Sequence, residues 1–327
     1  MSGAYPIPAK LNVALTATQA IVALGLLWVA SHAQSQQVFW LAVVGFAFWM
    51  QMAFSILHEA EHNKLHPVRA VNDALGTLMA MLFPGSYQLL KVAHLNHHRV
   101  NRSNAELVDY IRPGESRVSK MLQFYLLICG FIWLIVILMS VIITVVPWSL
   151  FRGASRGDEP STSGARLYFG FLRDVGVVRV RIETLVTIAF WGTAFWLLDL
   201  EWSAVLVCYV AFAFSWSSQQ YIYHVRSPRH LVDGAFNLKL WRPLELLYLN
   251  FNHHLSHHRA VSVPWIHMRR WTLEHGDAPT QGYLATYLQL WRPPEPVERA
   301  WPVDFQAKGP LGPPPGALVG ASDQRLT

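Results

Sequence analysis

The chain is poor in charge and in cysteine. Only two of its 327 residues are cysteines, Cys129 and Cys208, and both lie inside apolar runs, so the sequence indicates neither a disulfide framework nor a thiolate metal site. Asp, Glu, Lys and Arg make up 14% of the residues, whereas about 25% is usual in soluble domains. Residues of the hydrophobic set make up 53%. This composition predicts that much of the surface faces lipid rather than water.

The net charge of +6 is spread along the chain rather than gathered in a basic arm. Basic residues flank the apolar runs, which is the arrangement that orients proteins in a membrane, and it argues against nucleic acid as a partner. A short head with one lysine, Lys10, precedes the first apolar run, and no convincing small-residue cleavage site follows it. We therefore expect no cleavable leader.

Four apolar runs are expected to cross the membrane: residues 11–30, 38–57, 184–198 and 203–223. A hydrocarbon core about 30 Å thick needs roughly 20 residues of helix. The connections within the two pairs contain no Lys or Arg, whereas the stretch after the second run is strongly basic. The positive-inside pattern predicts two membrane hairpins, with the long basic segments in the cytoplasm.

A further apolar run, residues 121–148, has basic residues on both sides. A single crossing here would move everything beyond it to the opposite side of the membrane. We therefore expect a re-entrant or interfacial segment with a bend near Cys129 and Gly130.

The rest of the chain is expected to be simpler. The run 74–90, interrupted by Gly76 and by a Pro-Gly pair, predicts a shallow or interfacial helix. Residues 151–181 form a polar connector. The predicted fold is all-α and integral to the membrane: a single domain over 1–292 with a cytoplasmic helical cap that carries the histidines described below. Residues 293–327, rich in Pro and Gly, are expected to be a poorly ordered tail.

Histidine is the residue type whose distribution is least random. Of fifteen histidines, eight fall into three tight groups, one with the pattern H-x-x-x-H and two with the pattern H-x-x-H-H. The grouped residues are His58 and His62, then His94, His97 and His98, then His254, His257 and His258. One such pentad can arise by chance, but two in one chain are far more specific.

The spacing has a physical meaning. Histidines three or four residues apart on a helix share a face, with Cβ atoms about 5–6 Å apart, close enough to bind one metal ion. In H-x-x-H-H the last two rings point about 100° apart around the helix, so one pentad could feed two metals. Imidazole suits iron, zinc, copper and nickel alike. The number of ligands exceeds what one ion can use and therefore predicts a dinuclear site.

Other polar residues have more open roles. His224, at the end of the fourth run, is expected to be a ninth ligand, with helix capping as the alternative. The six other histidines are expected to lie outside the metal set: His32, His66, His230, His253, His267 and His275. Basic residues that suit either an anionic headgroup or the lipid surface are Lys91, Arg99 and Arg102.

Metal-bound imidazoles usually donate their second ring N–H to a neighbouring acceptor. The principal candidates to orient the histidine rings in this way are Glu61, Asp109, Gln220, Asn252 and His253. Glu106 and Asp233 are further acidic residues nearby in the sequence. For Glu61 and Asp109 a solvated charge or a helix cap is an equally good interpretation.

Two other metal-site classes match part of the pattern. His58, Glu59 and His62 form the H-E-x-x-H motif of zinc proteases, in which Glu59 would be the general base. That interpretation leaves both pentads unexplained, and the N-x-x-P-x-P and L-D-G elements of intramembrane zinc proteases are missing from the sequence. A carboxylate di-iron bundle needs Glu-x-x-His on two helices, but the groups supply it once. Both alternatives are disfavoured, and a metal transport or storage protein stays a third possibility.

All three histidine groups together resemble the membrane fatty acid desaturase superfamily. Its pattern is H-x(3-4)-H, then H-x(2-3)-H-H about thirty residues later, then H/Q-x(2-3)-H-H after another membrane hairpin. The segment 249–258, L-N-F-N-H-H-L-S-H-H, with V-P-W at 263–265, is particularly similar to bacterial acyl-lipid desaturases.

The resemblance implies a four-span bundle under a cytoplasmic cap, two iron ions and O2 as co-substrate. It also implies a lipid or fatty-acid substrate and a separate electron donor of the ferredoxin, rubredoxin or cytochrome b5 type, in a bacterial inner membrane. Desaturation of an acyl chain is the expected reaction. Hydroxylation, or oxidative decarboxylation to a terminal alkene, is the alternative on the same scaffold, because a fold specifies its metal site better than its product.

Overall fold

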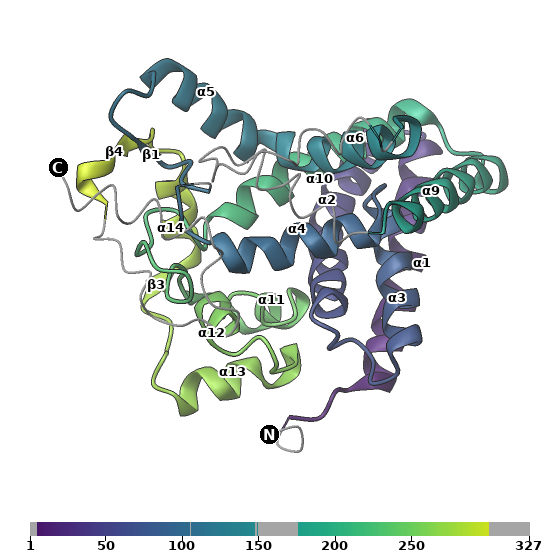
Figure 1. Ribbon diagram of the computed structural model, residues 1–327. Helices are drawn as coiled ribbons and strands as arrows, with labels where there is room; N and C mark the ends of the chain where they lie inside the picture. Colours follow the sequence, from purple (N-terminus) through teal and green to yellow (C-terminus); the bar gives the residue numbers. More distant parts are fainter. Residues whose placement is uncertain (1–4, 105, 148, 150–175, 301–327) are drawn as a thin grey trace.

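The apolar runs form long helices in the computed structural model, which describes residues 5–104, 106–147, 149 and 176–300 (Figure 1). In this part of the chain, four helical segments are long and apolar enough to cross a membrane: Ala9–Ser31 (α1), Gln36–Glu61 (α2), Arg117–Val145 and Val177–Leu198 (α9). The third consists of α5 (Arg117–Leu126), the π-turn η1 (Leu127–Phe131) and α6 (Ile132–Val145). The predicted helical class and the number of apolar spans agree with the structure.

The set of candidate spans differs from the predicted set in one member. Helix α10 (Trp202–Tyr221) forms where the run 203–223 predicts it, and its 20 residues are long enough, but its mean hydropathy is too low for a candidate span. The reason is its polar second half, which carries serines and glutamines from Ser215 to Gln220. The segment Arg117–Val145 qualifies instead, although we expected a re-entrant or interfacial run there.

The predicted bend in that segment is present. Gly130 has a φ of +123°, a conformation that favours glycine, and it interrupts the helical backbone between α5 and α6. A β-carbon at this position would lie 3.4 Å from Ala213 of α10. The glycine therefore allows both the bend and the close approach to α10.

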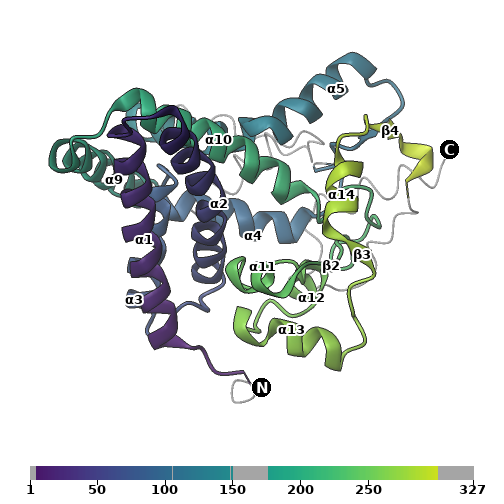
Figure 2. The same cartoon turned by 180° about the vertical axis from the view of Figure 1, so that it is seen from behind.

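Helices α1 and α2 form a closely packed hairpin, seen side by side in Figure 2. Ser35 caps α2 by accepting the N–H of Val38, and Leu27 and Phe46 are fully buried in the core that the two helices share with α3 and α10. Helices α9 and α10 are also joined by a short turn. However, α9 packs mainly on α6, whereas α10 packs on α2 and η1. The two helices of the second predicted hairpin, α9 and α10, therefore pack on different neighbours rather than mainly on each other.

The run 74–90 forms two helices rather than one, α3 (Arg69–Leu82) and α4 (Tyr87–Val100). Gly76 lies inside α3 and does not interrupt it. A β-carbon there would lie 2.6 Å from the Tyr87 ring and 2.9 Å from Cβ of Ala60. The glycine lets α2, α3 and α4 approach closely, which is a packing role that the sequence pattern did not distinguish from a break.

A buried carboxylate holds the N-terminus of α4. Glu183 of α9 accepts hydrogen bonds from the Ser86 hydroxyl at 2.7 Å and from the Gln88 N–H at 2.9 Å. A negative charge at a helix N-terminus is favourable because the free N–H groups and the helix dipole point toward it. Helix α4, which carries the second histidine group, is thereby anchored to a membrane helix.

Short elements complete the described structure: β1 (Tyr110–Ile111), β2 (Leu238–Lys239), α11 (Arg242–Leu247), α12 (His254–Arg259), α13 (Trp265–Glu274), β3 (Gln281–Gly282), α14 (Tyr283–Leu290), β4 (Glu295–Pro296) and η2 (Val297–Arg299). Strands β1 and β4 pair in parallel, as do β2 and β3. In both views α11, α12 and α13 lie toward the end of the hairpin where α1 begins (Figures 1 and 2).

The described structure continues past residue 293, because β4 and η2 belong to the segment predicted to be a tail. The remainder of that tail, 301–327, lies outside the described residues, as does most of the predicted connector 151–181. Residues 177–181 of that connector already belong to α9.

Candidate metal centre

The nine histidines predicted as ligands lie together in two groups. Site 1 consists of His58, His62, His94, His98 and His257, and site 2 consists of His97, His224, His254 and His258. Within each group the ring nitrogens that could serve as ligands lie within 4.8 Å of one another. The remaining histidines belong to neither group.

Each pentad contributes to both sites, as its spacing predicts. On α4, His94 and His98 are four residues apart and face site 1, whereas His97 points around the helix to site 2. On α12 the division is reversed, because His254 and His258 face site 2 and His257 faces site 1. Two short helices therefore connect the two groups, and rings of His98 and His258 lie 4.4 Å apart between centroids.

The other ligand candidates come from the ends of long helices. His58 lies in the last turn of α2, and His62 is its C-cap residue. His224 lies just beyond α10, whose last residue is Tyr221, and its ring is buried. The end of α2 thus supplies His58 and His62 to site 1, and the turn after α10 supplies His224 to site 2.

The ring nitrogens face one another within each site. In site 1, Nε2 of His94 lies 2.7 Å from Nε2 of His62 and 3.0 Å from Nε2 of His98. In site 2, Nε2 of His254 lies 2.9 Å from Nε2 of His224 and 3.3 Å from Nε2 of His258. A cluster of like ring nitrogens at these distances is the arrangement expected around a cation that takes up their lone pairs.

The protonation state of the cluster suits a metal. Burial, reinforced by the neighbouring histidines, keeps the pKa values of five of these rings well below 6.5: His94, His98 and His257 in site 1, and His254 and His258 in site 2. These five rings are neutral at pH 7, which is the form that binds metal ions. In addition, Nε2 of His58 is buried without a hydrogen-bond partner. This orphaned atom, in a cluster of neutral donors, fits a bound metal ion.

Two rings of site 2 are oriented by acceptors outside the histidine groups. Nδ1 of His97 lies 2.8 Å from a carboxylate oxygen of Glu106, and Nδ1 of His224 lies 2.8 Å from the backbone oxygen of Gly234. Such contacts fix the tautomer and leave Nε2 for a metal. Glu106 belonged only to the wider set of acidic candidates, and the Gly234 carbonyl has no signal in the sequence.

The five principal candidates for this orienting role are placed differently. Glu61 comes nearest, with a carboxylate oxygen 4.0 Å from Nδ1 of His94, which is too far for a direct hydrogen bond. The amide of Asn252 donates to Glu245 and to the Leu238 carbonyl. His253 faces Glu245 at 3.7 Å, and Gln220 makes no hydrogen bond to a histidine in the described part of the chain.

Asp109 pairs with an arginine instead of orienting a histidine. Both its carboxylate oxygens accept from Arg102, at 2.8 and 3.0 Å, and both side chains are buried. Asp109 also accepts from the Tyr221 hydroxyl and from the N–H of Arg226. The pair therefore ties the loop after α4 to the turn that carries His224. A headgroup role for Arg102 is excluded by this burial, and Lys91 is likewise buried rather than lipid-facing.

Glu59 is not placed as the general base of a zinc protease. Its Oε2 atom accepts the backbone N–H of Trp265 at 3.1 Å, at the start of α13. The histidines on either side of it share site 1 with His94, His98 and His257. The carboxylate is thus engaged in holding α13, and the H-E-x-x-H pair is only part of a larger donor set.

Replacing Gly234 with alanine is expected to disturb site 2. The new β-carbon would overlap the His230 carbonyl and lie 2.5 Å from Cγ of Arg102, so the backbone carbonyl that orients His224 must move. We expect a loss of about 1–3 kcal/mol of stability from overpacking and a lower metal content at site 2. Thermal denaturation in detergent and metal analysis test this, and an unchanged melting temperature with unchanged metal content would contradict it. Gly276→Asn is the control. Gly276 has a φ of +73° with open space around it, and asparagine tolerates a positive φ, so this variant should match the wild type.

A family model described as fatty acid desaturase matches residues 35–290, which include all nine histidines. No curated protein matches the chain. Since the family match covers well over half of the sequence, the chain belongs to the fatty acid desaturase family.

Proposed function

We propose that the protein is a membrane di-iron oxidase that uses O2 to desaturate a fatty-acyl chain. The observation that carries the proposal is the division of nine clustered histidines into one group of five and one of four. Two iron ions bound there would activate O2 to abstract hydrogen from an unactivated carbon. The protein's own residues hold the ions, orient the rings and keep bulk water away.

The number of donors favours a dinuclear site over a single zinc ion. A catalytic zinc ion usually takes three protein ligands and leaves one position open, so two adjacent groups of four and five histidines exceed its needs. The same count argues against a storage role built on one ion. Membership of the desaturase family adds to this argument, because the family is associated with oxidation of lipid chains.

Partners and orientation follow from the same proposal. The substrate is a lipid or fatty acid whose chain reaches the sites between the helices. Electrons come from a separate donor of the ferredoxin, rubredoxin or cytochrome b5 type. We infer that both sites lie on the cytoplasmic face of a bacterial inner membrane, which the basic segments next to the first two histidine groups support.

Mass spectrometry of lipids and volatile hydrocarbons tests the proposal. Cells that express the chain are compared with cells that express His97→Ala, which lacks a site-2 ligand. A new unsaturated acyl chain is expected from the wild type and not from the variant. A hydroxylated chain or a shortened terminal alkene would assign the alternative product on the same scaffold. No new product of any of these kinds would refute the oxidase.

A further inference from the structure

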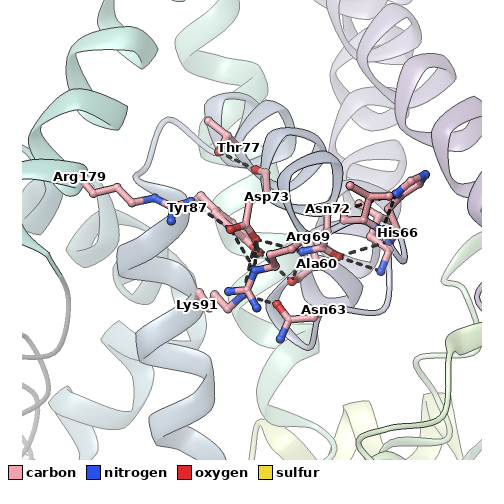
Figure 3. A network of polar contacts seen from close by, with 12 residues as sticks. Ala60, Asn63, His66, Arg69, Asn72, Asp73, Thr77, Tyr87, Lys91 and Arg179 are labelled. Carbon is pink, nitrogen blue, oxygen red and sulfur yellow. Dashed lines mark hydrogen bonds and ion pairs between the residues drawn. The ribbon is translucent and has the colours of Figure 1, made fainter. Parts of the chain in front are cut away.

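A polar network beside site 1 connects the first and second histidine groups (Figure 3). At its centre, Nζ of Lys91 lies 2.7 Å from Oδ1 of Asn63 and 3.2 Å from the Tyr87 hydroxyl. Asp73 of α3 lies 3.9 Å from the same ammonium. The lysine side chain is only 7% exposed, so these contacts form in a largely dry environment, where they are stronger than at the surface.

The network also binds the backbone of α2 between its two histidines. The Tyr87 hydroxyl donates to the Ala60 carbonyl at 2.7 Å, and the Asn72 amide donates to the same oxygen at 3.0 Å. Ala60 lies midway between His58 and His62. Asn63, which directly follows His62, has a left-handed φ of 59° and holds its side chain toward Lys91. The path of the chain at His62 is therefore fixed from both sides.

The spacing along α4 explains how these contacts reach the second histidine group. Tyr87, Lys91, His94 and His98 follow one another at intervals of four, three and four residues, so all four lie on one face of the helix. The first two contact the end of α2 and the turn after it, and the last two belong to site 1. The contacts of Tyr87 and Lys91 with α2 therefore fix how α4 is rotated about its axis and where His94 and His98 lie relative to site 1.

Site 1 depends on such indirect support more than site 2 does. Glu106 and the Gly234 carbonyl contact rings of site 2 directly, whereas Glu61 stands 4.0 Å from the His94 ring. Burial lowers the pKa of Lys91 to about 8, with Asp73 and Glu61 acting in the opposite direction. The lysine is consequently still an ammonium at pH 7, and it can hold the acceptors around it.

We propose that Lys91 and Tyr87 are positioning residues for site 1: they join α4 to the end of α2 and so set the geometry of His62 and His94. This inference rests on the proposed di-iron function. It assigns the network to one of the two irons, because the only histidine-bearing helices that its described contacts reach are α2 and, on its site-1 face, α4. Neither residue belongs to the two histidine groups.

The test compares Lys91→Met and Tyr87→Phe with the wild type as full-length protein in detergent, loaded with iron. Lys239→Met, at an exposed lysine, is the matched control. Iron titration gives affinity, and Mössbauer spectra separate the two sites. We expect Lys91→Met and Tyr87→Phe to bind the site-1 iron about 10- to 100-fold more weakly, to keep the site-2 signal, and to lose activity in parallel. Lys239→Met should match the wild type.

Equal weakening of both iron signals would overturn the inference, because a general structural role would not select one site. Wild-type affinity at both sites would overturn it as well. Should Lys91→Met fail to fold, Tyr87→Phe decides, since it keeps the ring and removes only the hydroxyl that binds Ala60. A wild-type chain that takes up fewer than two irons would instead refute the proposed function, which separates the two failures.

Discussion

Replacing His257 with alanine is expected to abolish product formation and to remove the iron of site 1. His257 is the only residue of α12 in that site, and its Nε2 atom lies 3.1 Å from Nε2 of His98 on α4. Loss of a partner outside the ligand set already costs about 10- to 100-fold in metal affinity or activity. Loss of a ligand should cost more than about 100-fold, measured as product per chain together with iron per chain.

The neighbouring residue supplies a matched comparison. His258 belongs to site 2, so His258→Ala should remove the other iron and leave the site-1 spectrum in place. His275→Ala is the control, because that ring is exposed and stacks on Trp271. Full activity in His257→Ala, or one retained zinc in place of iron, would contradict the di-iron function and favour the protease or storage alternatives.

Replacing Asp109 with alanine is expected to destabilise the protein by about 3–5 kcal/mol, because it leaves a buried arginine without its partner. The Arg102 side chain is 1% exposed and the Asp109 side chain 0%. The change also removes the acceptor for the Tyr221 hydroxyl and for the Arg226 N–H. Chemical denaturation in detergent, followed by circular dichroism, measures the effect.

Two further variants show whether the cost comes from the unpaired charge. The double replacement Asp109→Leu with Arg102→Met should recover much of the stability, since exchange of both partners for apolar residues is often nearly neutral. Glu274→Ala breaks an exposed pair with Arg270 and should cost no more than about 1 kcal/mol. A loss below about 1 kcal/mol in Asp109→Ala would contradict the structural role of the pair.

The sequence allowed the histidine groups to be predicted because their chemistry depends on local spacing. Intervals of three and four residues place imidazoles on defined helix faces, and the division of each pentad between two sites follows from that geometry. His224 could be proposed from its place at the end of an apolar run. The ligand role of these residues stays a proposal, whereas their convergence is a property of the structure.

The acceptors around the rings could not be predicted in the same way. Asp109 lies close to the second group in sequence but faces Arg102, and Glu106 faces His97. Which of the two turns toward a histidine depends on how the loop after α4 folds. A backbone carbonyl such as that of Gly234 carries no residue-specific signal at all. These contacts depend on tertiary packing, which no spacing rule contains.

The membrane segments show a similar division. Apolar length predicted helices at all the expected places, but it did not predict their partners. In the structure α10 packs on α2 and on the turn that contains Gly130, whereas α9 packs on α6. Polar residues in the second half of α10 can be tolerated because that half lies against the protein, where Ser215 accepts from both Gln51 and Gln219.

Each H-x-x-H-H pentad supplies histidines to both sites, and this arrangement has a consequence for stability. Helices α4 and α12 each reach both sites, so either ion alone cross-links segments whose histidines lie 159 residues apart. Closing such a long loop has an entropic cost in the unfolded chain, so either ion alone should favour the folded protein. Iron-loaded protein should accordingly unfold at a higher temperature than the empty chain, and a variant that keeps one ion should lie between the two.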